Sequence, residues 1–343
     1  MIRAAIVGGT GYGGMELLRL SLGHPQLDIV ALTSRSEKGR VGDSHGHLRG
    51  LTDLEYTDAE PAELAKDVDL VFVATPHAAA ARIVDSVLCA DPTVVVIDLS
   101  GAHRLGTNAL HAAHYGEDHP HLERLVEATY ALPECGGRQA LKSSPRLIAN
   151  PGCHATAALL ATWPLAREGL VAGRIAITSA TGSTGSGSKP SPGTHHPNRA
   201  SDFRPYNPLR HQHVPEVEAC LAAAGLTAPK VDLVPQSAPI ARGIVSTAFV
   251  PVPNGREQEA VDVVRASYED APLVRVLDAP PAVRAVAGSS LADVHVATDD
   301  GLACVMVAID NLGKGMAGTA VQNANLRFGL PEATGLHFAG AGP

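Results

Sequence analysis

The chain has 343 residues, of which 45% are hydrophobic and 18% charged, a composition typical of a globular protein with room for two domains. The formal net charge of −8 and the lack of a Lys/Arg cluster argue against a nucleic-acid partner. No apolar run reaches the roughly 20 residues that span a bilayer, and the N-terminus lacks a signal-peptide pattern, so we expect a cytoplasmic protein without a membrane partner. Five scattered cysteines without a CxxC pair suit a reducing compartment.

The first half of the sequence alternates strand-like and helix-like segments. Short runs rich in valine and isoleucine alternate with helix formers, as expected for parallel strands that are covered on both faces. The strand-like runs are residues 3–8, 27–34, 69–75 and 93–100, and helices are expected from Met15 and over 78–90. This half therefore predicts an α/β domain with a parallel sheet.

The second half changes in texture. Its strand-like runs are residues 174–180, 243–252, 294–300 and 303–309, with a helix over 257–270. They indicate an α+β domain with a mostly antiparallel sheet. The polar segment 181–213 is long for a loop in a compact protein, and such loops are usually functional or disordered.

A glycine-rich turn follows the first strand. Gly9-x-Gly11-x-x-Gly14 lies between a predicted strand and a predicted helix, which is the context of a dinucleotide-binding turn. The glycines permit a tight turn and close approach of a pyrophosphate to the helix N-terminus. The predicted ligands here are Gly8, Gly9, Thr10, Gly11, Tyr12, Gly13 and Gly14.

The residues after the second strand favour NADP(H) over NAD(H). NAD enzymes place an acidic residue about 20 residues after the turn, whereas this chain has Thr33-Ser34-Arg35, a combination that suits a 2′-phosphate. Arg35 as a solvated loop residue is the alternative. Further predicted cofactor ligands are Ser34, Arg35, Pro76, His77, Ser100, Gly182 and Asn311. His77 is equally well explained as an ordinary loop histidine.

Cys153 is the predicted nucleophile. Pro151-Gly152 ends an apolar run, and Cys153 begins a run of helix formers. The dipole and free N–H groups of a helix N-terminus lower the pKa of a thiol and can also hold an oxyanion. The alternative is that Cys153 is a small buried apolar residue, as most cysteines are.

The segment "HQHVPEVE" offers His211 and His213 as acid–base groups, with Glu216 nearby. Alternating histidines on an extended segment point to opposite sides, so one can face the thiol. With His195 and His196 in the same loop, a zinc site is a rival interpretation, but the usual ligand spacing is absent and no metal is predicted. A nicotinamide cofactor and an activated cysteine together indicate chemistry through a thioester.

At this point the sequence resembles a known family. The segments "GGTGYGGMELLRL", "NPGCHAT", "HQHVPEVE", "ARGIVST" and "DNLGKGMAGTAVQNANL" are similar to those of the N-acetyl-γ-glutamyl-phosphate reductases of arginine biosynthesis, in the same order along nearly the whole chain. The resemblance implies a Rossmann domain, here residues 1–150 and 313–343, and a catalytic and oligomerisation domain, residues 151–312. It also implies a C-terminal helix that returns to the Rossmann domain, and homotetramers or dimers.

The resemblance implies an enzyme that reduces an acyl phosphate to an aldehyde with NADPH. Cys153 attacks the acyl phosphate, the thioester is reduced, and a semialdehyde is released. His211, slightly preferred, or His213 is the acid–base group. Residues that match the family's substrate pocket are Arg104, Arg204, Tyr206 and Arg242. For each arginine, a surface ion pair is the alternative.

Two positions depart from the family pattern. His154 stands where an aromatic residue usually follows the cysteine, and Ala102-His103-Arg104 replaces the usual Asp-Phe-Arg. A sister group, the reductases of carrier-protein-bound aminoadipyl or glutamyl phosphate in lysine and arginine biosynthesis, shares "TSRSEKGRVGDSHGHLRG" and "SPGTHHPNRA". Arg199, Arg204 and Arg210 would then suit an acidic carrier.

We expect the arginine-type reaction, with the carrier-bound substrate as the alternative. Aspartate-semialdehyde dehydrogenases share the cofactor and the thiol but lack the HxH-x-P-E and DNLxKG segments. An NADP-binding regulator with a silent thiol is a further alternative.

Overall fold

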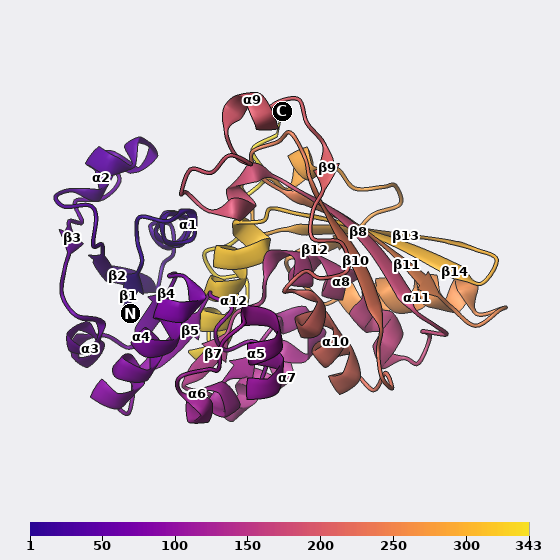
Figure 1. Cartoon of the computed structure of the whole chain (residues 1–343), viewed down its shortest axis with the longest axis horizontal. Helices are drawn as coiled ribbons and strands as arrows, with labels where there is room; N and C mark the ends of the chain where they lie inside the picture. The colour runs from indigo at the N-terminus through magenta and orange to yellow at the C-terminus, as the bar shows by residue number, and fades with distance from the viewer. Residues whose placement is uncertain (343) are drawn as a thin grey trace. The chain divides into compact units, whose positions relative to one another are not determined.

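The valine- and isoleucine-rich runs of the first half pair into a seven-stranded sheet in which every pairing is parallel (Figure 1). The strand order is β3-β2-β1-β4-β5-β7-β6. The strands are β1 (Ile2–Val7), β2 (Leu27–Thr33), β3 (Tyr56–Thr57), β4 (Leu70–Val73), β5 (Val95–Asp98), β6 (Thr129–Tyr130) and β7 (Leu147–Ala149). β4 is buried along its whole length and reads as an unbroken apolar run. β5 is also buried throughout, including Asp98 at its end.

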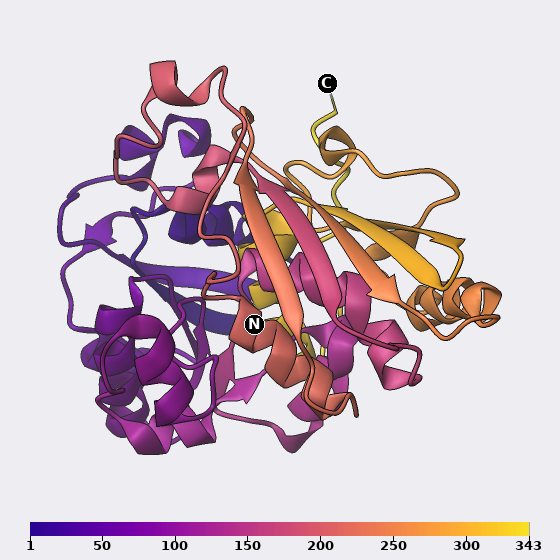
Figure 2. The same cartoon turned by 45° about the vertical axis from the view of Figure 1, so that its right-hand side comes forward.

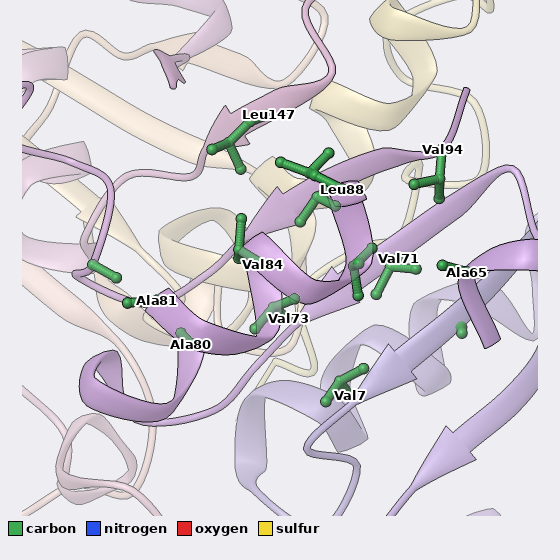
Figure 3. Close-up of a cluster of buried hydrophobic side chains, with 14 residues drawn as sticks. Val7, Ala65, Val71, Val73, Ala80, Ala81, Val84, Leu88, Val94 and Leu147 are labelled. Atoms are coloured by element: carbon green, nitrogen blue, oxygen red, sulfur yellow. The ribbon is translucent and has the colours of Figure 1, made fainter. Parts of the chain in front are cut away.

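Helices connect these strands. They are α1 (Tyr12–Ser21), α2 (Val41–Ser44), α3 (Pro61–Leu64), α4 (His77–Ala90), α5 (Asn108–Tyr115), α6 (Leu122–Glu127) and α7 (Arg138–Ala140). α4 shows how they attach: its buried residues recur at helical spacing, with Ala80, Val84 and Leu88 on one face. Figure 3 shows these side chains packed against Val71 and Val73 of β4. Burial of each valine or leucine contributes about 1.5–3 kcal/mol.

The second half forms a mixed seven-stranded sheet of order β12-β13-β14-β11-β8-β10-β9, whose strands lie side by side in Figure 2. Four of its six pairings are antiparallel, and β8–β10 and β12–β13 are parallel. The strands are β8 (Ile175–Thr181), β9 (Arg204–Pro205), β10 (Val231–Ser237), β11 (Ile244–Pro251), β12 (Val274–Val276), β13 (Ala292–Asp299) and β14 (Leu302–Ile309). Burial alternates along β8, β10 and β11, so one face is covered and the other is not.

Three helices cover that inner face: α8 (Cys153–Arg167), α10 (Val214–Ala223) and α11 (Glu257–Tyr268). The segment predicted as a long loop contains the short α9 (His196–Arg199) and the edge strand β9. The predicted class is confirmed: a Rossmann-type α/β part is followed by an α+β part with a mixed, mostly antiparallel sheet.

The computed structural model describes residues 1–342, which form two compact units. The first unit comprises Met1–Pro133, Gly137–Pro151 and Met316–Leu336. The second comprises Glu134–Gly136, Gly152–Gly315 and residues 337–342. Residues 134–136, 313–315 and 337–342 are predicted in the first domain and lie in the second unit instead. No helix within residues 1–342 combines the length and apolarity needed to cross a membrane.

The C-terminal helix α12 (Gly318–Arg327) belongs to the first unit, as predicted, and packs beside α1 (Figure 1). Buried polar contacts tie it in place. Asn323 donates its side-chain amide to the Ala131 carbonyl at 2.9 Å, and Asn325 Oδ1 lies 2.9 Å from His24 Nε2. These bonds explain why a helix at the end of the chain carries buried asparagines.

Candidate active site

The glycine-rich turn joins β1 to α1 at the carboxyl edge of the parallel sheet. Gly8 has a φ of +94°, in the left-handed region, and a Cβ added there would lie 2.7 Å from the Ala74 carbonyl oxygen. A Cβ on Gly14 would lie 2.6 Å from the Gly8 carbonyl oxygen, so this glycine allows close packing of helix on strand. A Cβ on Gly11 would meet only that same oxygen, at 3.8 Å, which leaves space beside the turn.

The first turn of α1 suits an anion. Its N-cap, Gly11, has no side-chain cap, and the turn carries no acidic side chain, so its N–H groups can bind phosphate oxygens. The turn therefore fits the pyrophosphate of a dinucleotide. The chain's predicted ligands there are Gly8, Gly9, Thr10, Gly11, Tyr12, Gly13 and Gly14.

The other predicted cofactor residues of the first unit lie at the carboxyl ends of β2, β4 and β5. Ser34 is buried, and its Oγ accepts the N–H groups of residues 36 and 37, so it caps a turn, whereas Arg35 is exposed. Pro76 is exposed, and His77 begins α4 with its ring 4.7 Å from that of Tyr115. The Ser100 hydroxyl donates to the buried Asp98 carboxylate at 3.0 Å.

Two predicted cofactor residues lie in the second unit, Gly182 and Asn311. A Cβ on Gly182 would lie 2.5 Å from the Ala241 carbonyl oxygen, so glycine permits a close approach of two loops. Asn311 is buried, and its Oδ1 accepts the Gly243 N–H at 2.7 Å while its amide donates to Thr184 Oγ1 at 3.0 Å. Asn311 thus fixes the loop that follows β8.

Cys153 is the first residue of α8 and is partly exposed. Gly152 is the N-cap with extended backbone angles, and the first turn has neither a side-chain cap nor an acidic residue. A thiolate at this place is stabilised by the helix dipole, and the same N–H groups can hold an oxyanion. The Cys153 Cβ lies 2.9 Å from the Cβ position of Gly315, so only glycine fits beside it.

The two histidines lie directly against this turn. His213 Nε2 lies 2.3 Å from where a Gly152 Cβ would stand, and its ring centroid is 4.6 Å from that of His211. Glu216 accepts the Gly152 N–H at 3.0 Å, and its other oxygen lies 3.8 Å from His213 Nε2. The structure thus brings together Cys153, His211 and His213, and it adds Glu216 as the group that joins the cysteine turn to the histidines.

Burial sets the ionisation of this cluster. Desolvation lowers the pKa of His211 to about 4, so its ring is neutral at pH 7. His211 Nδ1 accepts the His213 N–H at 3.2 Å, which leaves the ring proton on Nε2. The pKa of Tyr206 is raised by burial first and by the negative charge of Cys153 second. The phenol is therefore protonated and within electrostatic range of the sulfur.

The segment "DNLGKG" packs against Cys153 through Gly315, a contact that its sequence does not reveal. The buried Asp310 accepts both side-chain bonds from Arg242 and the N–H groups of Gly288, Leu312 and Gly313. A few residues further, Gly315 packs on Cys153. This carboxylate therefore fixes the loop that contacts the nucleophile.

The predicted substrate arginines have different surroundings. Arg104 is buried in the first unit, where it donates to the carbonyl oxygens of Leu99 and Asn150, both at 2.8 Å. Arg204 pairs with Asp202 and is half exposed. Arg242 binds Asp310 through two nitrogens at 2.8 and 2.9 Å. Tyr206 lies in the cysteine cluster, with its ring centroid 5.9 Å from that of His211.

In residues 1–342, the loop histidines His195, His196, His211 and His213 are not part of a group of close metal-ligand atoms. Within residues 1–342, the group with close ligand atoms is Asp85, His121 and Glu123 in the first unit. It lies at the surface, and the Asp85 carboxylate already accepts a bond from Arg124 Nε at 2.9 Å. Because the arginine already neutralises that carboxylate, the group carries no argument for a metal.

Replacing Gly152 by alanine is expected to lower kcat about 100-fold or more. The new Cβ overlaps His213 Nε2 at 2.3 Å, so the imidazole must leave its place beside the cysteine turn. Steady-state kinetics on the purified variant give the value. Gly46→Ala is the matched control, since its Cβ has open space. Equal loss in the two variants would contradict this packing.

Comparisons with known proteins show the family to which the chain is similar. Residues 3–144 match the family described as semialdehyde dehydrogenase, NAD binding domain, and residues 153–311 match semialdehyde dehydrogenase, dimerisation domain. The chain is 41% identical to an N-acetyl-gamma-glutamyl-phosphate reductase of Methanopyrus kandleri, with 100% of both chains covered. It is 38% identical to a putative LysW-L-2-aminoadipate 6-phosphate reductase of Thermomicrobium roseum, covering 100% of this chain and 99% of that one.

Solved structures support the same fold. A probable aspartate-semialdehyde dehydrogenase from Pseudomonas aeruginosa matches with a TM-score of 0.71 and 17% identity, covering 95% of this chain and 98% of that one. The aspartate semialdehyde dehydrogenase with NADP from Candida albicans matches with a TM-score of 0.67 and 16% identity, with the same coverage of 95% and 98%. The chain therefore belongs to the N-acetyl-gamma-glutamyl-phosphate reductase family, whose members are oxidoreductases built from the two semialdehyde dehydrogenase domains.

Proposed function

We propose that the protein reduces N-acetyl-γ-glutamyl phosphate to N-acetylglutamate semialdehyde with NADPH, releasing phosphate. The observation that carries the proposal is the cysteine turn: a partly exposed thiol begins a helix, the buried imidazole of His213 packs on the residue before it, and the buried imidazole of His211 lies beside that of His213. That arrangement supplies a nucleophile, an acid–base group and oxyanion donors in one place.

The proposed reaction begins with attack of the Cys153 thiolate on the acyl carbon. The acid–base histidine takes the thiol proton as the sulfur attacks. It passes that proton to the departing phosphate as the bond from the acyl carbon to the phosphate oxygen breaks, and a thioester remains. NADPH, when bound at the glycine-rich turn, supplies the hydride that reduces the thioester. The first-turn N–H groups of α8 hold the resulting oxyanion until the C–S bond breaks, the aldehyde forms and the thiolate is free again.

We assign the acid–base role to His211, with His213 as the second candidate. The Nδ1 of His211 accepts a backbone N–H, so Nε2 is the ring nitrogen through which His211 would exchange a proton. His213 is packed on Gly152, and its Nε2 lies 3.8 Å from the Glu216 carboxylate. This pairing suits a residue that holds the turn in shape. Tyr206, Arg204 and Arg242 remain proposed substrate ligands, as does Arg104.

We assign the cofactor as NADP(H). The dinucleotide-binding match leaves the choice between NAD and NADP open, and a relative of the same fold was solved with NADP. The exposed guanidinium of Arg35, directly after Ser34 at the end of β2, supports the choice because it suits a 2′-phosphate.

Arg35→Ala is expected to weaken NADPH binding about tenfold and to leave NADH binding unchanged, since a charge-assisted contact to phosphate contributes about 1.5–3 kcal/mol. Titration calorimetry with each nucleotide gives the two dissociation constants. Arg49→Ala is the control, because Arg49 is equally an exposed arginine of the first unit. If Arg35→Ala weakens both nucleotides equally, the 2′-phosphate is not its partner.

The substrate assignment has one alternative, a carrier-bound aminoadipyl or glutamyl phosphate. It is favoured by the relative from Thermomicrobium roseum and by the arginines Arg199, Arg204 and Arg210 around the long loop. The test is the phosphate-dependent reverse reaction with NADP, offering N-acetylglutamate semialdehyde and carrier-bound aminoadipate semialdehyde separately. Turnover with the first supports the proposal; turnover with the second alone replaces it.

We propose that two copies assemble through the open face of the mixed sheet, as a dimer or as the dimer unit of a tetramer. The second part of the chain matches a dimerisation domain. The paired positions on this face carry mostly apolar side chains, with Phe249 opposite Cys304 and Thr247 opposite Met306. A surface of this kind, without a helix over it, suits a second copy of itself.

Phe249→Glu is expected to convert the dimer to a monomer at micromolar concentration, because each interface would bury two added carboxylates. Light scattering after size exclusion measures the mass. Val126→Glu is the control, since Val126 is 77% exposed in the first unit. A Phe249→Glu protein that keeps its wild-type mass would rule out this face.

A further inference from the structure

His154, the residue after the candidate nucleophile, is hydrogen-bonded at both ring nitrogens. Its Nδ1 lies 2.7 Å from Ser179 Oγ on β8, and its Nε2 lies 3.0 Å from the Tyr206 hydroxyl. The ring is 2% exposed, so these two groups are its hydrogen-bond environment in an otherwise apolar helix interior.

The same ring forms one wall of the cysteine cluster. Its centroid lies 5.1 Å from that of His211 and 6.0 Å from that of His213. Tyr206 completes the group, with its ring 5.9 Å from His211. The Tyr206 hydroxyl is therefore hydrogen-bonded to His154, the residue next to Cys153 in the chain, and the negative charge of Cys153 contributes to the raised pKa of Tyr206.

His154 acts as a neutral group here. Burial lowers its pKa to about 3, and His211 lowers it further when that ring is protonated. The groups that face it are Ser179, Tyr206, His211 and His213, none of which is a carboxylate. A neutral imidazole has one N–H and one acceptor nitrogen. It can therefore accept a hydrogen bond on one side of the ring and donate one on the other.

We propose that His154 is a positioning residue that fixes the Tyr206 hydroxyl beside Cys153, and that this hydroxyl stabilises the anion formed there. Ser179 donates to Nδ1, Nε2–H donates to the phenol oxygen, and the phenol proton is left for the thiolate or the oxyanion. The kinetic consequence rests on the proposed reductase function.

Two amide substitutions separate the bonds. The His154→Asn amide reaches the Nδ1 position and keeps the Ser179 bond, whereas the His154→Gln amide reaches the Nε2 position and keeps the Tyr206 bond. We expect H154N and Tyr206→Phe each to lower kcat about 100- to 1,000-fold, as when an oxyanion donor is lost, and to change KM less than kcat. H154Q should recover most of that loss.

The double variant H154N with Y206F decides whether the two residues act together. If His154 works through the hydroxyl, the double variant has the kcat of Y206F alone. Multiplied effects would overturn the proposal, and so would H154Q and H154N of equal activity.

A second readout needs no substrate. The rate of iodoacetamide alkylation of Cys153, followed on its peptide by mass spectrometry across pH, gives the thiol midpoint. H154N and Y206F should raise this midpoint, and H154Q should leave it near that of the wild type. If the wild type shows no reductase turnover, the proposed function fails, but the midpoints still test the role of His154. If H154N fails to fold, the Y206F variant still decides: an unchanged pH midpoint of Cys153 alkylation in Y206F would refute the proposal.

Discussion

Replacing Cys153 by serine is expected to lower kcat by at least about 10⁴-fold while the affinity for NADPH stays unchanged. A serine hydroxyl is not ionised by a helix N-terminus at neutral pH, so the thioester cannot form. Loss of a nucleophile in enzymes with covalent intermediates has effects of this order or larger. The main-chain groups of the glycine-rich turn, which are proposed to bind the pyrophosphate, are unchanged in this variant, so nucleotide binding should persist.

Single-turnover kinetics and nucleotide titration on the same preparation test both halves of this expectation. Cys89→Ser is the matched control, because Cys89 is an exposed cysteine of the first unit. Turnover retained in the Cys153→Ser protein would end the thioester account. A parallel loss of nucleotide binding would show that the variant is misfolded rather than chemically silent.

Removing one partner of the Lys314–Glu134 ion pair is expected to cost about 3–5 kcal/mol of unfolding free energy. Both side chains are fully buried, with Nζ and Oε1 2.7 Å apart, in residues 180 positions apart in sequence. Lys314→Met or Glu134→Leu alone leaves a buried charge without its counter-charge. Since Lys314 precedes Gly315, which packs on Cys153, the loss also loosens the support of the cysteine.

Urea unfolding of the two single variants and of the double variant measures this effect. The double variant, which buries no charge, should recover most of the lost stability. The exposed pair Arg256–Glu259 is the control, with side chains 42% and 47% exposed, and Arg256→Ala should cost less than about 1 kcal/mol. Equal costs at the two pairs would contradict the burial argument.

The parts of the fold that were predictable are those with a periodic signal. β4 and β5 are buried throughout, β4 reads as an apolar run, and α8 follows a Pro-Gly turn as expected. The short strands β3 and β6 have two residues each and carry no such signal. They form because neighbouring strands offer free backbone groups, which is a tertiary effect.

The candidate site shows the same division. Cys153 and the HxH segment could be predicted as site residues from the sequence, because a helix start and a pair of histidines are local patterns. The close packing of His213 on Gly152 and the Ser179–His154–Tyr206 bonds depend on chain segments far apart, so no pattern predicts them. The position of Arg242 in the sequence likewise does not show that two of its N–H groups donate to Asp310.

The central claim is that the Cys153 sulfur becomes acylated before any reduction takes place. The most direct measurement mixes the enzyme with the acyl phosphate in the absence of nucleotide and follows phosphate release together with the mass of the Cys153 peptide. The account predicts a burst of one phosphate per active site and an acylated Cys153 peptide, both lost in the Cys153→Ser variant. An unmodified peptide and no phosphate until NADPH is added would contradict it.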